Sequence, residues 1–190
     1  MMIIKHFKPD FEMDWDEFSE VTGFEEGKGT WASAGILWMA ANGFRVKHIC
    51  DVDYQALADK GADYIIEYAG AETGKWMVEH TNVPAERTRA KKLVESGLAE
   101  KRIPTIDDIR LLLDKGYLVR VGVNSRRLNN QDGFFGHAVV IIGYDKNGLV
   151  FHDPGPPSEK ARKASYKDFE AAWADPNETT KELDAIKLKT

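Results

Sequence analysis

A β-hairpin in the C-terminal half of the chain constrains the fold more than any other feature. An apolar run from Ala138 to Tyr144 is followed by the turn sequence Asp145-Lys146-Asn147-Gly148, and a second apolar run covers Leu149 to His152. Two apolar runs joined by a short turn that ends in Asn-Gly are typical of an antiparallel hairpin. The pair Asp153-Pro154 ends the second strand, because proline has no backbone N–H to donate to a sheet.

The remaining elements are arranged as helices first and strands later. Capping residues and helical spacing predict helices over 1–7, 14–23, 31–41, 53–60, 104–116 and 165–173, and a broken helical region over 70–97. Alternating residues predict strands over 44–50, 117–124 and 183–188. This order predicts an α+β fold with N-terminal helices packed on a C-terminal antiparallel sheet, in one domain over 1–190. We expect Thr30 to cap the helix over 31–41, and we expect these residues in the core: Trp38, Val140, Ile142 and Trp173.

The composition excludes several classes of protein. The formal net charge is −5 and the pI is about 5.6, which is unfavourable for general nucleic-acid binding. No apolar run is long enough to span a membrane, and the N-terminal apolar stretch is too short for a signal peptide. The cytoplasm is therefore the default location, unless a longer N-terminus carries a signal. One cysteine excludes an intrachain disulfide and a cysteine-based zinc cage. The five histidines lack ligand spacing, so we expect neither a metal nor a cofactor.

His137 and Asp153 are the residues best suited to chemistry. His137 begins one strand of the hairpin and Asp153 ends the other, so both lie at the same edge of the sheet. A histidine can act as a general base near neutral pH, and a carboxylate at its other ring nitrogen fixes the tautomer and stabilises the imidazolium. Ideal pairing puts Asp153 opposite Val140, roughly 10 Å along the strand from His137. Direct contact therefore requires strand twist or a bulge.

Each of these residues also has a purely structural interpretation. A histidine at a strand end often hydrogen-bonds a loop, and an aspartate before proline often forms a turn. A structural α+β domain without a site would be favoured if His137 and Asp153 lay beyond hydrogen-bonding distance with no cleft between them.

The sequence around the hairpin resembles a known family. Gly136-His137-Ala138-Val139-Val140, with Gly143-Tyr144-Asp145 and His152-Asp153-Pro154, resembles the C39-like family of papain-fold cysteine peptidases. Residues 104–119 resemble the helix and strand that lead into the family's histidine hairpin, and 14–44 resemble its second and third helices. The region of about 63–98 looks like a helical insertion. The resemblance implies a papain-like fold and thiol-dependent hydrolysis of a peptide or amide bond, with His137 as catalytic base and Asp153 as its orienting acid.

The family's nucleophile has no counterpart in this sequence. Its members carry a cysteine at the N-terminus of the first helix, after an oxyanion-stabilising glutamine, whereas Met1–Phe7 has no capping residue and matches only the later part of that helix. Cys50 is a poor substitute, because the nearby carboxylates of Asp51 and Asp53 disfavour a thiolate. We expect Cys50 to be a small, half-buried apolar residue.

Two explanations for the missing nucleophile stay open. Met1 is an internal methionine of a longer protein whose cysteine lies upstream, or the chain is an inactive relative. Under either explanation, we expect these 190 residues alone to hydrolyse nothing. The alternative function is a non-catalytic papain-fold module that binds a peptide or another partner.

The expected partner is a peptide or a small amide substrate, and neither nucleic acid nor a membrane span is expected. Asn124 and Arg126 precede His137 in a polar loop and are candidate substrate contacts. The sequence leaves open the identity of the substrate, the oligomeric state and any association with a transporter.

Overall fold

The computed structural model describes residues 1–189 and confirms the predicted α+β class. The chain forms two compact units. The first unit contains Met1–Pro9, Arg45–Asp51 and residues 100–189, and the second contains Asp10–Phe44 and Val52–Ala99. His137 and Asp153 both belong to the first unit. The predictions of one domain over 1–190 and of an insertion over 63–98 stay predictions.

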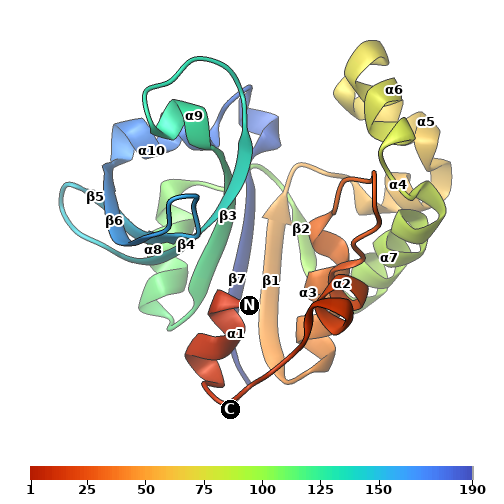
Figure 1. Ribbon diagram of the computed structural model, residues 1–190. Coiled ribbons are helices and arrows are strands. Elements are labelled where there is room, and N and C mark those ends of the chain that lie inside the picture. Colours follow the sequence, from red (N-terminus) through yellow and green to blue (C-terminus); the bar gives the residue numbers. More distant parts are fainter. Residues whose placement is uncertain (190) are drawn as a thin grey trace. The chain divides into compact units, whose positions relative to one another are not determined.

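The first unit is built on a mostly antiparallel sheet, which has seven strands within residues 1–189. The strands lie in the order β2 (Ala99–Lys101), β1 (Phe44–Cys50), β7 (Glu182–Leu188), β3 (Leu118–Asn124), β4 (Gly136–Tyr144), β5 (Gly148–Asp153) and β6 (Glu159–Ser165). β4 and β5 form the predicted hairpin. In Figure 1, the strands β3 to β6 form a strongly curved part of the sheet.

One face of this sheet carries the main hydrophobic core. Val121 on β3 lies opposite Val139 on β4 and Leu183 on β7, and all three side chains are fully buried. The helices α8 (Ile106–Asp114) and α10 (Tyr166–Trp173) pack on these strands. Burial of each large apolar side chain stabilises the fold by roughly 1.5–3 kcal/mol. This core holds the strand ends that carry His137 and Asp153.

The sequence signals at the helix ends of this unit are confirmed. Thr105 accepts a hydrogen bond from the Asp108 N–H, and the Asp108 carboxylate accepts one from the Thr105 N–H, which completes a capping box. Ser165 caps α10 through the Asp168 N–H. The helix α1 (Met2–Phe7) has no side-chain cap, as predicted, and lies against β7.

The second unit is helical. It contains α2 (Trp15–Thr22), α3 (Ala32–Ala41), α4 (Tyr54–Lys60), α5 (Ala62–Ala69), α6 (Ala71–Glu79) and α7 (Val83–Ser96). The predicted capping box of Asp14 and Glu17 is confirmed at α2. The predicted cap of α3 is wrong: Trp31, not Thr30, occupies the N-cap position, and its side chain makes no capping hydrogen bond.

Several elements and burial states differ from the predictions. The strands β2 and β6, the helix α9 (Ser125–Leu128) and the 3-10 helix Glu178–Thr180 had no recognised signal in the sequence. Val140 and Trp173 are buried as predicted, but Trp38 and Ile142 are only partly buried. Ile142 lies where the pairing of β4 with β5 becomes irregular, so its side chain leaves the regular alternation. In Figure 1, α9 lies over one end of the curved strands, close to the start of β4.

Candidate functional site

A β-bulge brings Asp153 to the face of the sheet that carries His137. Gly143 pairs with Val150, but Ile141 pairs with Phe151, so β4 has one extra residue at Ile142. Asp153 therefore moves from a position opposite Val140 to one opposite Val139. Because side chains alternate along a strand, this one-residue slip puts Asp153 on the same face as Val139 and His137. The predicted requirement for twist or a bulge is thus met by a bulge.

The two side chains are in direct contact. Nε2 of His137 lies 2.7 Å from Oδ1 of Asp153, and the side chains are 13% and 8% exposed. The other ring nitrogen, Nδ1, has no hydrogen-bond partner among residues 1–189 that would occupy it. A carboxylate at Nε2 favours the Nε2–H tautomer and leaves the Nδ1 lone pair available to accept a proton. The condition that would favour a purely structural domain, His137 and Asp153 beyond hydrogen-bonding distance, is therefore not met.

Asp153 is held as an anion by three donors. Oδ1 also accepts the Gly155 N–H at 2.9 Å, and Oδ2 accepts Nη1 of Arg162 at 2.9 Å. Burial by itself would raise the pKa of Asp153, but the hydrogen bonds from Gly155, His137 and Arg162 outweigh burial and lower that pKa. The carboxylate is consequently ionised at neutral pH and can stabilise a charged imidazole.

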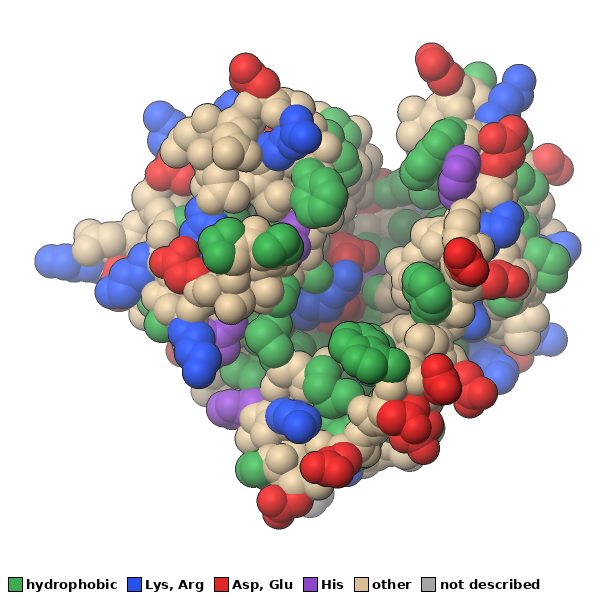
Figure 2. Space-filling view, in the orientation of Figure 1, with side chains coloured by type: hydrophobic (Ala, Val, Ile, Leu, Met, Phe, Trp, Pro, Cys, Tyr) green, Lys and Arg blue, Asp and Glu red, His purple; other side chains and the backbone are tan. Residues whose placement is uncertain are grey.

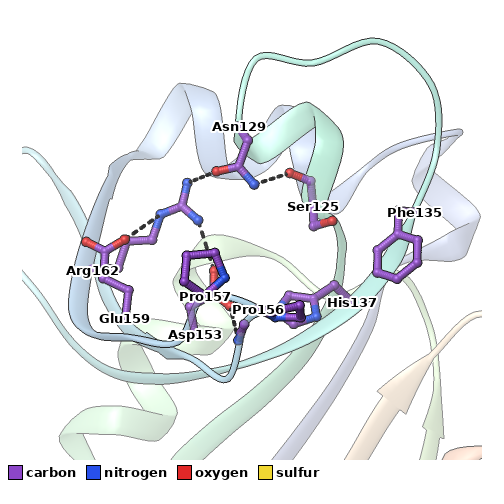
Figure 3. Close-up of a pocket in the computed structure, with 10 residues that line it drawn as sticks. Ser125, Asn129, Phe135, His137, Asp153, Pro156, Pro157, Glu159 and Arg162 are labelled. Atoms are coloured by element: carbon purple, nitrogen blue, oxygen red, sulfur yellow. Dashed lines mark hydrogen bonds and ion pairs between the residues drawn. The ribbon is translucent and has the colours of Figure 1, made fainter.

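His137 borders two hollows of the first unit. The acid-side cavity, of about 130 Å³, is lined by Ser125, Phe135, Asp153 and Arg162 together with Pro156 and Pro157. Figure 3 shows how these side chains surround His137 and Asp153. The sheet-face groove, of about 370 Å³, is lined by Arg120, Gly122, Phe134, Ala138, Trp173 and Glu182. His137 is thus a lining residue of both hollows.

The two predicted substrate contacts hold the loop before His137. Asn124 is 1% exposed, and its Oδ1 accepts the N–H groups of Arg126 and Phe135, both at 3.0 Å. Its Nδ2 donates to the Gly133 carbonyl at 2.9 Å. The exposed Arg126 donates to the Asp132 carbonyl at 3.2 Å. Neither residue lines the acid-side cavity or the sheet-face groove as the structure describes them, and a substrate contact from either stays a prediction.

Cys50 belongs to a different group of side chains. It is 4% exposed, so the prediction of a half-buried apolar residue is wrong, and it hydrogen-bonds His48. Nδ1 of His48 lies 2.6 Å from Oδ1 of Asp184, and Oδ2 of Asp184 accepts Nη1 of Arg120 at 2.7 Å. His48 and Asp184 are 136 positions apart in the sequence. The group spans three neighbouring strands, with His48 and Cys50 on β1, Asp184 on β7 and Arg120 on β3.

Cys50 is too far from His137 to act with it. In the sheet, β7 and β3 lie between β1 and β4. Neighbouring strands are about 4.8 Å apart, so Cys50 and His137 are separated by roughly 14 Å. The sequence argument against Cys50 as the nucleophile therefore gains a geometric reason.

The described residues also bear on three other features: a metal-ligating cluster, a membrane-spanning helix and a charged patch. Within residues 1–189, no group of three or more His, Cys, Asp or Glu side chains is arranged to hold a metal ion. Of the helices described, none has both the length and the apolar composition needed to cross a bilayer. On the face drawn in Figure 2, Lys and Arg side chains are interspersed with Asp and Glu.

Sequence reasoning missed Arg162 and α9. Arg162 lies on β6, a strand with mostly polar, exposed residues that carry no periodic apolar signal. α9 is only four residues long, so it has no helical repeat to recognise. Its N-cap residue, Asn124, is the local signal that could have indicated a helix start.

Comparison with known proteins identifies a family. The model of the Peptidase_C39 like family matches residues 39–180. This range includes both members of the His137–Asp153 pair. No curated protein matches the chain.

Proposed function

The chain belongs to the Peptidase_C39 like family, and from this premise we propose that His137 and Asp153 are the base and the orienting acid of a cysteine-peptidase site. The observation that carries the proposal is the 2.7 Å contact between His137 Nε2 and Asp153 Oδ1, which leaves Nδ1 available. The proposed substrate is a peptide or another amide.

In the proposed reaction, His137 first accepts a proton from the nucleophile and later donates it to the leaving group. Nδ1 accepts the proton of a thiol, and the resulting thiolate attacks the amide carbonyl. The imidazolium then gives this proton to the leaving amine, and water hydrolyses the thioester with His137 acting again as base. Asp153 keeps the ring in the required tautomer and stabilises its charged form.

The thiol is the component that these 190 residues do not supply at the site. Their single cysteine, Cys50, is buried beside His48, roughly 14 Å from His137 by strand spacing. We therefore propose that the 190-residue chain alone turns over no amide substrate. A thiol from outside these residues would complete the site.

A second candidate is a non-catalytic module that binds a peptide. The observation in its favour is the sheet-face groove of about 370 Å³ beside His137, in a chain whose cysteine lies elsewhere. The discriminating measurement is the intact mass of the protein isolated from its source cells, with thiols counted by alkylation after denaturation. A mass above that of the 190 residues with a second thiol supports the peptidase. A matching mass with one thiol supports the binding module.

Activity tests the same proposal directly. The purified 190-residue chain should release no product from peptide or amide substrates. Turnover that is abolished in His137→Ala and kept in His80→Ala would contradict the proposed inactivity. His80 is a suitable control because it lies in the second unit, stacked on Trp76. A native form with a second thiol that shows no turnover dependent on His137 would contradict the assignment of the base.

A further inference from the structure

Arg162 holds the carboxylate of Asp153 from the side opposite His137. Nη1 of Arg162 donates to Asp153 Oδ2 at 2.9 Å. Nη2 donates to the Leu128 carbonyl at 3.1 Å and to Oδ1 of Asn129 at 2.8 Å. The Arg162 side chain is only 18% exposed. Figure 3 shows its guanidinium between Asn129 and Asp153. One side chain of β6 thus ties the acid to α9.

These contacts leave the carboxylate little freedom to rotate. Oδ1 accepts from His137 and from the Gly155 N–H, while Oδ2 accepts from Arg162. Without Arg162, the carboxylate could turn and exchange the oxygen that it offers to the ring. A planar guanidinium that bonds several fixed acceptors defines an orientation, which the single ammonium group of a lysine cannot do equally well.

The charge of Arg162 also acts on His137 through the shared carboxylate. A cation on Oδ2 takes part of the negative charge that would otherwise stabilise an imidazolium at Oδ1. The other charged residues that line the two hollows with His137 are Glu159, Arg120, Asp175 and Glu182. Glu159 lies 3.8 Å from Nε of Arg162 but is 60% exposed, so its influence is weakened by solvent.

We propose that Arg162 is a positioning residue of the site: it fixes the plane of Asp153, reserves Oδ1 for the His137 Nε2–H, and thereby keeps Nδ1 unprotonated as the base. This inference rests on the proposed function. It assigns the selection of the reactive tautomer to a residue that does not touch His137.

The test is the nitrogen NMR signal of the His137 ring, recorded over a pH series in the 190-residue chain with labelled histidine. In Arg162→Gln, the ratio of the Nε2–H to the Nδ1–H tautomer should fall by up to about tenfold, because a carboxylate that is free to rotate loses part of its hydrogen bond to the Nε2–H. This readout reports on the ring itself and not on general stability.

Two further variants separate orientation from charge. Arg162→Lys keeps the charge but loses the planar guanidinium, so the tautomer ratio should still fall. Lys163→Gln is the matched control: it removes a cation from the next position of β6, where Lys163 is 71% exposed and 3.5 Å from Asp145. The tautomer ratio of His137 should not change in Lys163→Gln.

The outcomes distinguish this inference from the proposed function. An unchanged tautomer ratio in Arg162→Gln overturns the role of Arg162. If Asp153→Ala alters the ratio while Arg162→Gln does not, the His137–Asp153 pair stands and only the inference fails. If Asp153→Ala also leaves the ratio unchanged, Asp153 does not orient the ring and the proposed function fails. Should Arg162→Gln not fold, Arg162→Lys decides: a reduced ratio supports the inference, and an unchanged ratio overturns it.

Discussion

The buried pair of His48 and Asp184 predicts a stability that falls as the pH rises above neutrality. His48 is 1% exposed and Asp184 is 2% exposed, and Nδ1 of His48 lies 2.6 Å from Oδ1 of Asp184. Burial by itself disfavours the charged imidazole. The hydrogen bonds and charges of Asp184 and Cys50 outweigh burial and raise the pKa of His48 to about 10.

The sign and size follow from proton linkage. In the unfolded chain, histidine has a pKa of about 6.5, so the folded chain binds the proton more tightly. The stabilisation is fully present below pH 6.5 and is lost as the pH rises through about 10. At about 1.4 kcal/mol per pH unit, the complete contribution is about 5 kcal/mol, and roughly 2 to 3 kcal/mol of it disappears between pH 7 and pH 9.

The assay compares free energies of unfolding in urea at pH 6, 7, 8 and 9, followed by tryptophan fluorescence. The chain as it stands should lose stability between pH 7 and pH 9 more steeply than His48→Gln, by roughly 1 kcal/mol per pH unit. The comparison of slopes removes the constant cost of deleting a buried side chain.

The control removes the thiol of Cys50, the other group that raises the pKa of His48. In Cys50→Ala, the steeper slope should remain, because Asp184 still holds the imidazolium. Parallel slopes for the unmodified chain and His48→Gln would refute the argument, since a histidine that is neutral in the folded state adds no such pH dependence.

Two further predictions concern packing and capping. Gly74→Ala should lower the free energy of unfolding by about 1–3 kcal/mol in urea titration, because the added Cβ would lie 2.4 Å from Cα of Ile66. Gly35→Ala, in the helix α3 with no heavy atom within 4 Å of the added Cβ, should instead stabilise by about 0.5–1 kcal/mol, and equal effects of the two variants would disprove the packing argument. Thr105→Ala removes the cap of α8 and should cost about 1 kcal/mol in thermal unfolding; no loss would show that Asp108 alone suffices there.

Local signals in the sequence predicted most of the elements that position the site. The Asp145–Gly148 turn, the Thr105 capping box and the apolar run of β3 each specify structure within a few residues, and all are confirmed. β6 was missed because its residues are mostly exposed and polar, so no alternation marks it. Arg162 was missed with it.

Contacts between distant strands were invisible for another reason. His48 and Asp184 lie 136 positions apart, and nothing local to either residue indicates the other. The alternation of β1 was recognised, but the sheet order that puts β7 beside β1 depends on the whole fold. For this reason Cys50 was expected to behave as an apolar residue. In the structure its side chain contacts His48, which is buried and charged.

The geometry of the candidate site depends on one residue that periodicity cannot place. Val139, Val140, Ile141 and Ile142 are all apolar, so the pattern of β4 does not specify which side chain faces the core. A regular hairpin would turn Asp153 to the face of Val140, away from His137. The extra residue at Ile142 reverses this, and the two side chains meet at 2.7 Å. The sequence thus identifies the base and the acid by residue type and position, whereas the register of β4 on β5 decides whether they form a pair.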